Sequence, residues 1–152
     1  CSLYGGDGDD RLASWAGASL LDGGAGDDTM IVGTGDATLK GGAGADIMTG
    51  GGGAQTFLYD ALDGSIDQIN WFTRGEDHLA FTAASLGVAA GTPFQANMFA
   101  LDAAVGAQAQ FVFDTASSTL YFDSDGNGSA SGVTVAQMVG LTTMSAADFR
   151  IV

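Results

Sequence analysis

Three aspartates, Asp10, Asp28 and Asp46, recur at an interval of eighteen residues, and each closes a short glycine-rich segment. A carboxylate held close to a tight turn, together with the carbonyls that a glycine turn exposes, supplies hard oxygen ligands. Ca²⁺ takes about six to eight such oxygens, whereas the smaller Mg²⁺ loses its water reluctantly. These residues therefore predict a cation site whose ion is Ca²⁺.

The aspartates belong to a repeat of nine residues. Residues 5–13, 23–31 and 41–49 read GGDGDDRLA, GGAGDDTMI and GGAGADIMT, with Asp at position six. The blocks between them keep the length and the glycine at position four, but not the aspartate. Position eight is an unbroken apolar column: Leu3, Leu12, Leu21, Met30, Leu39, Met48 and Phe57. A flexible glycine-rich linker has no reason to keep such a column in register, so the pattern favours an ordered repeat.

The pattern GGxGxDxUx resembles the calcium-binding nonapeptide repeat of RTX proteins, and the resemblance covers about the first 58 residues. It implies that two repeats form one coil and that alternate repeats stack on the same edge, at a spacing of about 4.8 Å. The expected fold is all-β. A parallel β-roll or β-helix solenoid of nonapeptide repeats would span residues 1–58, followed by an antiparallel β cap over residues 59–152.

The resemblance also implies where the ions lie. On one edge the aspartates form a ladder, whereas the position-six residues on the other edge carry no carboxylate: Ser19, Ala37 and Gln55. One ion is expected in each gap between successive aspartate-bearing turns, held by carbonyls of positions one and three of one turn and two and four of the next. Beside Asp10, Asp28 and Asp46, this predicts Gly5, Asp7, Gly24 and Gly26 for the first gap, and Gly23, Ala25, Gly42 and Gly44 for the second. Asp36, at position five on the other edge, is expected to matter little.

Composition narrows the partners of the chain. Among 152 residues, 18 are acidic and 4 are basic, for a net charge of −14. This balance argues against nucleic acid and anionic membranes, which select Lys and Arg. The 25 glycines make the chain costly to order, and Cys1 is the only cysteine, so no disulfide can offset that cost. Metal is the remaining source of stabilisation. No signal peptide or membrane-length apolar run is present.

Catalytic patterns are absent from the sequence. It contains no H-E-x-x-H, G-x-S-x-G, P-loop or G-x-G-x-x-G motif. His78 is the single histidine, and Cys1 has no base nearby in sequence, so neither forms a nucleophile pair. Adjacent acidic residues such as Asp27 and Asp28 are explained by the repeat rather than by glycosidase chemistry. We expect no active site in this chain.

Beyond the repeat, most of the aromatic residues are found, in segments where apolar and polar residues alternate. Residues 66–81 (IDQINWFTRGEDHLAF) resemble the region that follows the repeats in RTX exoproteins, although Trp71 stands where that family tends to have Asp. A cap over the open end of the solenoid is favoured over a metal role. Residues 110–114, 119–123 and 133–137 alternate as strands and predict an antiparallel meander.

Two weaker signals concern the last third of the chain. Asp123, Asp125, Asn127 and Gly128 match the start of an EF-hand-like loop, but Thr134 replaces the bidentate Glu at position twelve, so a hairpin turn is favoured over a calcium site. Residues 145–152 (SAADFRIV) resemble the C-terminus of exoproteins exported by type I machinery, and they also suit a final strand.

The expected function is a calcium-binding folding and secretion module of a secreted or cell-surface protein, without catalysis of its own. The chain begins within a repeat and without Met, so we expect it to be the C-terminal part of a longer exoprotein. Its expected partners are calcium ions and, during export, the type I machinery. The alternative is an adhesive or polysaccharide-binding module that engages a surface glycan through outward positions of the repeat: Ala13, Asp22, Ile31, Lys40, Thr49 and Leu58.

Overall fold

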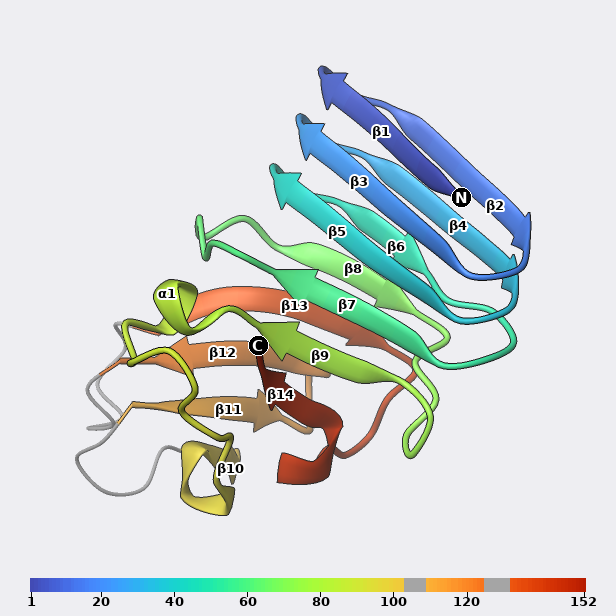
Figure 1. The fold of residues 1–152 in the computed structure, drawn as a ribbon. Helices are drawn as coiled ribbons and strands as arrows, with labels where there is room; N and C mark the ends of the chain where they lie inside the picture. Colours follow the sequence, from blue (N-terminus) through green and yellow to red (C-terminus); the bar gives the residue numbers. More distant parts are fainter. Residues whose placement is uncertain (103–108, 125–131) are drawn as a thin grey trace.

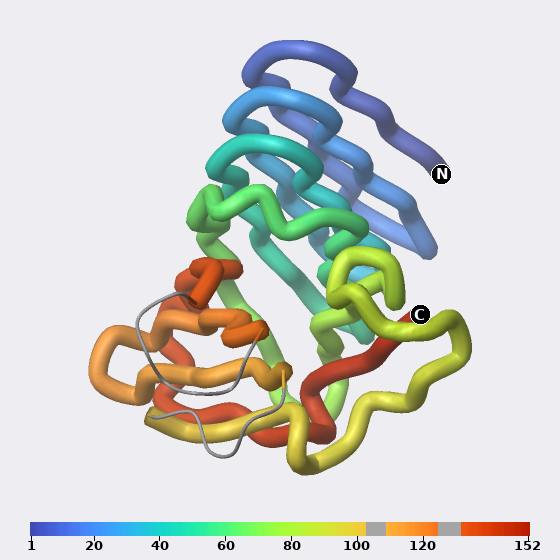
Figure 2. Tube along the Cα trace, turned by 90° about the vertical axis from the view of Figure 1, so that its left-hand side faces the viewer, coloured from blue at the N-terminus to red at the C-terminus, as the bar shows by residue number. Residues whose placement is uncertain are grey.

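The computed structural model describes residues 1–102, 109–124 and 132–152, and it shows a solenoid whose coils alternate between two facing sheets (Figure 1). Turned by 90°, the successive coils lie one above the next, with the later strands closing one end (Figure 2). The first nine strands are β1 (Ser2–Asp7), β2 (Arg11–Ala16), β3 (Ser19–Ala25), β4 (Thr29–Thr34), β5 (Ala37–Ala43), β6 (Ile47–Thr49), β7 (Gln55–Tyr59), β8 (Asp67–Asn70) and β9 (His78–Phe81).

Short helices and five further strands follow β9. They are α1 (Ala83–Leu86), the 3-10 helix η1 (Ala96–Met98), β10 (Phe99–Leu101), β11 (Gln110–Asp114), β12 (Thr119–Asp123), β13 (Val133–Val139), the 3-10 helix η2 (Ala146–Asp148) and β14 (Phe149–Ile151). Within the described residues, one sheet has the order β1-β3-β5-β7-β9-β14 and the other β10-β11-β12-β13-β8-β6-β4-β2. No helix of these residues is long and apolar enough to cross a membrane.

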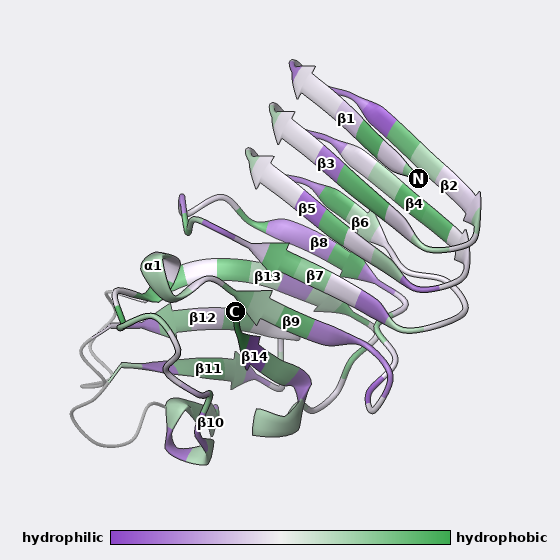
Figure 3. Ribbon diagram, viewed as in Figure 1, coloured by the Kyte–Doolittle hydropathy of each residue, from purple (hydrophilic) through white to green (hydrophobic). Residues whose placement is uncertain are grey.

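The register of the parallel strands places equivalent repeat positions beside one another. Leu3 pairs with Leu21 and Leu21 with Leu39, one coil apart. In the facing sheet Met30 pairs with Met48. These side chains point between the sheets because the strand period of two turns every second residue inward. Figure 3 shows apolar, green segments at corresponding places on successive strands of the solenoid. The predicted stacking of alternate repeats is confirmed.

Parallel pairing continues past the repeat. Strand β8 pairs with β6, β9 with β7, β13 with β8, and β14 with β9, all in parallel. The antiparallel meander is confirmed for β11, β12 and β13, and the last residues form the expected final strand. The all-β solenoid is confirmed, but its antiparallel part is smaller than predicted, because β8 and β9 satisfy the open N–H and C=O groups of the last repeat coil. The boundary expected between residues 58 and 59 falls inside β7, and both sheets run across it.

Phe57 joins the column of the repeat to the aromatic core of the later strands. Its side chain is fully buried, and its ring centroid lies 5.9 Å from that of Phe72. We expect Phe57→Ala to lower the free energy of unfolding by about 3–5 kcal/mol, because the cavity cannot be filled by the rigid coil around it. Urea denaturation in excess Ca²⁺ measures the loss. Tyr4→Ala, at a residue 66% exposed in the same sheet, is the control and should change stability by less than about 0.5 kcal/mol. Similar losses in both variants would contradict this role.

Candidate metal centre

Glycine turns on one edge of the solenoid bring the aspartates together. They connect β1 to β2, β3 to β4 and β5 to β6, and their glycines adopt backbone angles that other residues rarely reach, such as φ of 110° at Gly24 and 128° at Gly26. The turns also stack so closely that a Cβ on Gly24 would collide with the carbonyl oxygen of Gly6. The sequence therefore needs glycine here for both conformation and space.

The position-six aspartates form a hydrogen-bonded ladder along this edge. The amide of Asp10 donates to Oδ1 of Asp28 at 2.7 Å, and the amide of Asp28 donates to Oδ1 of Asp46 at 2.9 Å. The other carboxylate oxygen, Oδ2, is buried without a hydrogen-bond partner in Asp10, Asp28 and Asp46 alike. A buried carboxylate oxygen without a partner is costly, so these three oxygens mark where a cation fits.

Backbone carbonyls point into the same gaps in a fixed pattern. Those of positions two and four face the following turn, as the Gly6 carbonyl does against Gly24. Those of positions one and three face the preceding turn, as Ala25 does when it accepts a hydrogen bond from the Gly8 amide at 2.6 Å. The first gap is therefore faced by the carbonyls of Gly6, Gly8, Gly23 and Ala25, and the second by those of Gly24, Gly26, Gly41 and Ala43.

These carbonyl directions differ from the assignment of carbonyls to gaps that the sequence predicted, and the ligands themselves stay a prediction. Each gap does combine positions one and three with two and four, but the turns that contribute them are reversed, because the strand direction fixes which way each carbonyl points. Extended to the neighbouring repeats, the same pattern turns the carbonyls of Gly5 and Asp7 away from the first gap, and those of Gly42 and Gly44 beyond the second. The residues that sequence reasoning missed are Gly6, Gly8, Gly41 and Ala43. The nine-residue period identifies these positions, but it does not say which way the backbone carbonyl of each one points.

Electrostatics of the ladder favour a cation. Asp28 and Asp46 are each 1% exposed. Burial, together with the charges of neighbouring aspartates, raises the pKa of Asp28 above its usual value and that of Asp46 to about 6. Among the described residues, no three His, Cys, Asp or Glu side chains converge on a single point. One carboxylate oxygen with several carbonyls per gap is a hard, oxygen-only donor set, which suits Ca²⁺ rather than a transition metal.

These raised pKa values predict how the ion-free chain responds to pH. Burial raises the pKa of Asp46 in the fold to about 6, above the usual aspartate value of 3.8, so without Ca²⁺ the folded state binds more protons than the unfolded state between those values. Stability must then rise as pH falls from about 7 towards about 4. We expect a larger folded fraction near pH 5 than near pH 8 in buffer stripped of Ca²⁺, measured by circular dichroism. A folded fraction that grows with pH under these conditions would contradict this.

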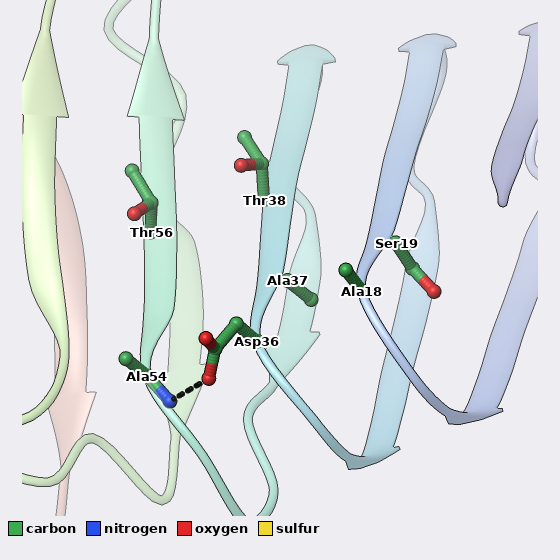
Figure 4. A pocket seen from close by; sticks show the side chains of 7 residues that line it. All are labelled: Ala18, Ser19, Asp36, Ala37, Thr38, Ala54 and Thr56. Atoms are coloured by element: carbon green, nitrogen blue, oxygen red, sulfur yellow. Dashed lines mark hydrogen bonds between the residues drawn. The ribbon is translucent and has the colours of Figure 1, made fainter.

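The opposite edge lacks the aspartate ladder. Figure 4 shows its pocket, where Ala37 occupies position six and the one carboxylate, that of Asp36, already accepts the Ala54 amide at 2.9 Å. One coil further, the fully buried Gln55 donates its side-chain amide to the Gly35 carbonyl at 3.0 Å. The amide nitrogen thus bridges two turns on the edge that lacks the aspartate ladder.

Later residues continue both edges. Asp77 accepts the Gln55 and Thr73 amides at 2.8 and 2.7 Å, so its two oxygens are paired and it acts as a turn cap. Asp67 accepts the Asp46 amide at 2.9 Å and extends the aspartate ladder by one turn. Sequence reasoning missed Asp67 as a ladder member because it lies twenty-one residues after Asp46 rather than eighteen. The DxI pattern at residues 67–69 was the signal that could have found it.

Three other candidates lie apart from this edge. Asp123 is 7% exposed in β12, and Thr134 is in β13, while Asp125, Asn127 and Gly128 lie outside the described residues, so the EF-hand-like loop stays a prediction. His78 Nε2 lies 3.1 Å from the Arg150 guanidinium. Cys1 is exposed with a free thiol.

Comparisons with known proteins agree with this geometry. The family model of the RTX calcium-binding nonapeptide repeat, in four copies, matches residues 2–21 and 22–54, about a third of the chain. A sequence search of curated proteins gives no match. Two similar solved structures are the R2 and R3 subunits of the AlgE6 mannuronan C5-epimerase of Azotobacter vinelandii, both at 24% identity.

These two structures share the fold over nearly the whole chain. The match to the R2 subunit has a TM-score of 0.64 and covers 98% of this chain and 91% of that one. The match to the R3 subunit has a TM-score of 0.60, with 95% and 79% covered. At this identity they show the fold alone. The repeat model, the aspartate ladder and the unpaired carboxylate oxygens coincide in the same residues. Residues 2–54 of this chain therefore belong to the RTX calcium-binding nonapeptide repeats.

Proposed function

We propose that this chain is a calcium-dependent folding and export module of a secreted or cell-surface protein. In this proposal residues 1–58 are the calcium-binding β-roll, and residues 59–152 are the cap that covers its end. The observation that carries the proposal is the row of buried, unpartnered Oδ2 atoms of Asp10, Asp28 and Asp46 along one edge. Such atoms oppose folding until a cation compensates them.

The ligand set proposed for each gap follows the carbonyl directions. Asp10 serves the first gap with the four carbonyls that face it, and Asp28 serves the second in the same way. Asp28 and Asp46 also hold the preceding turn through Oδ1, so these two side chains are fixed by a backbone amide before an ion arrives. Bound Ca²⁺ supplies the positive charge that these oxygens and carbonyls require.

In this proposal the repeat folds only in a compartment where the Ca²⁺ concentration is high. With a net charge of −14 and 25 glycines, the chain gains little from ordering its repeat when Ca²⁺ is scarce, as in a cytoplasm. An open chain suits passage through export machinery, and binding to the folded state alone then drives folding where Ca²⁺ is near millimolar. The resemblance of residues 145–152 to type I export signals supports the same proposal. Circular dichroism with and without Ca²⁺ tests it.

A second candidate function is a calcium-dependent adhesive module that binds a polysaccharide. Two exposed tryptophans favour it: Trp15 is 70% exposed and Trp71 is 73% exposed. Indole faces in water stack on sugar rings as they do on other flat, partly apolar groups. A glycan array probed with and without Ca²⁺ separates the two functions, with mannuronan as the first polysaccharide. Polysaccharide binding that is seen in the presence of Ca²⁺ and disappears in a Trp15→Ala, Trp71→Ala double variant would establish adhesion.

A further inference from the structure

The sheet that contains β2, β4, β6, β8 and β13 has an outer face without carboxylates, although the chain carries 18 acidic residues and a net charge of −14. These five strands, which the structure describes in full, hold one acidic residue, Asp67, and it is buried at 5% exposure. Outward positions alternate with the buried ones and carry mainly hydroxyl, carboxamide and aliphatic groups, with Arg11 as the one cation. We call these outward positions the carboxylate-free face.

Two exposed tryptophans border this face at the edge of the solenoid opposite the aspartate ladder. Trp15 lies near the end of β2, and Trp71 directly follows β8. The two strands between them offer glycine at the corresponding places, because a Cβ on Gly33 would meet the Trp15 carbonyl and one on Gly51 would meet the Gly33 carbonyl. The Trp71 carbonyl in turn lies against Gly50. The two tryptophans therefore flank a bare stretch of backbone about 14 Å long, which is three strand spacings.

Packing does not explain either indole. Trp15 is 70% exposed and Trp71 is 73% exposed, so their rings bury little apolar surface. The backbone of Trp71 also has a φ of 59°, in the left-handed region where bulky residues are rare and glycine is favoured. A strained backbone that holds a large ring in water is typical of a binding site rather than of a core. The two rings are therefore placed for contact with a ligand.

Carboxamide and hydroxyl groups on the same face are already held in place. The side-chain amide of Gln68 donates to Oδ1 of Asn70 at 3.1 Å, and that of Asn70 donates to the Thr49 hydroxyl at 3.3 Å, across β6 and β8. Each carboxamide has a second N–H that these bonds do not use. Paired amide donors and acceptors match the neighbouring hydroxyls of a sugar, each of which both donates and accepts.

We propose that the carboxylate-free face binds an uncharged polysaccharide, which lies across the strands with sugar rings stacked on Trp15 and Trp71 and hydroxyls at the β8 carboxamides. The apolar face of a pyranose ring stacks on an indole. Strands about 4.8 Å apart also repeat at nearly the length of one sugar unit in an extended chain. The inference deepens the adhesive candidate, and it rests on the proposed function, because calcium must first fold the coils that carry the face.

Charge decides between an uncharged and an acidic polysaccharide. The net charge of −14 repels polyanions, and Arg11 is the one basic residue on the five strands. Mannuronan, a polyanion, is therefore the weaker ligand. An apolar protein partner fits less well, because Ile47 on β6 and Val139 on β13, 39% and 44% exposed, have the carboxamides of β8 between them.

The fluorescence of the chain gives a direct test, because Trp15 and Trp71 are its only tryptophans. Cellohexaose and β-1,4-mannohexaose are titrated in excess Ca²⁺, beside a mannuronan hexamer and cellobiose. We expect the uncharged hexamers to change the tryptophan emission and to bind at least about tenfold more tightly than the acidic hexamer. Cellobiose should be weaker by a similar factor, because it cannot reach both indoles.

Single variants separate binding from folding. Trp15→Ala and Trp71→Gly should each weaken binding of the uncharged hexamers by about tenfold, measured by calorimetry. Trp71→Gly should not lower the stability of the calcium-bound chain, since glycine relieves the strained backbone. Tyr4→Ala is the matched control, because Tyr4 is an exposed aromatic residue of the facing sheet, and it should bind as the parent does.

Unchanged emission with every uncharged hexamer, in a chain that circular dichroism shows to be folded by Ca²⁺, would overturn the inference and leave calcium-dependent folding intact. Tighter binding of the mannuronan hexamer would overturn it as well. So would self-association that the two tryptophan variants abolish, because it would assign the face to a second copy of the chain. A chain that stays folded in excess chelator and binds no Ca²⁺ would instead contradict the proposed function.

Discussion

In buffer stripped of calcium, the chain is expected to lose most of its strand signal in circular dichroism, and millimolar Ca²⁺ is expected to restore it cooperatively. Three buried carboxylate oxygens without partners, close glycine stacking and a charge of −14 all oppose the ion-free fold. One ion at about a hundred times its Kd contributes about 2.7 kcal/mol, so two ions contribute about 5 kcal/mol, which is comparable to the whole stability of a marginally stable small domain.

Magnesium and monovalent salt are the controls for this experiment. Mg²⁺ prefers a small octahedral shell rich in water, which carbonyls fixed by parallel strands do not offer, so it should restore little structure at equal concentration. Sodium chloride at the same ionic strength tests whether screening of the acidic surface is enough. A spectrum that stays fully folded in excess chelator, with no heat of calcium binding, would end the calcium-folding proposal.

The second large effect is expected from Asp28→Asn. Asp28 alone touches both of the gaps matched by the repeat model: Oδ1 holds the Asp10 amide across the first, and Oδ2 is unpaired at the second. Loss of its charge should weaken both ions and reduce the calcium-dependent stability by about 5 kcal/mol, twice the contribution of one ion. Calcium titrations followed by circular dichroism should show the folding midpoint move to much higher Ca²⁺ than in the parent.

Asp36→Asn is the matched control for that variant. Asp36 also accepts a backbone amide of the next coil, that of Ala54, but it lies on the edge without the ladder. Its replacement should shift the midpoint only slightly. Asp10→Asn provides a graded comparison, because Asp10 has its unpaired oxygen at the first gap only. Equal shifts of the Ca²⁺ midpoint in Asp28→Asn and Asp36→Asn would show that the aspartate ladder contributes no more to calcium-dependent folding than the opposite edge does.

Much of the solenoid was predictable because its repeat is strictly periodic. The unbroken column from Leu3 to Phe57 specifies which residues point inward, and the even spacing of Asp10, Asp28 and Asp46 specifies one edge. The alternating strands at residues 110–123 could be predicted for the same reason, since a period of two identifies a strand by itself. The family resemblance then supplied the pairing of two repeats per coil.

Features without a fixed period could not be predicted. The carbonyl directions depend on how each strand enters its turn, and no pattern of residue types encodes that. Asp67 escaped notice because the turn before it is longer than a repeat turn, and only the DxI pattern at residues 67–69 marks it. Strands β8 and β9 continue the parallel pairing because the last repeat coil would otherwise leave its backbone N–H and C=O groups unpaired. This requirement concerns contacts between strands far apart in sequence, so no short stretch of the sequence reveals it.

The Gln55 amide gives the two edges of the solenoid different responses to the Ca²⁺ concentration. It bridges the Gly35 and Gln55 turns with a neutral group that no chelator removes, whereas the facing edge depends on a dissociable ion. When Ca²⁺ leaves, the coils should therefore part first along the aspartate side, with the glutamine side acting as a hinge. Reclosure then begins from strands already held in register near the end of the repeat, which makes Gln55 a starting point for folding when Ca²⁺ returns.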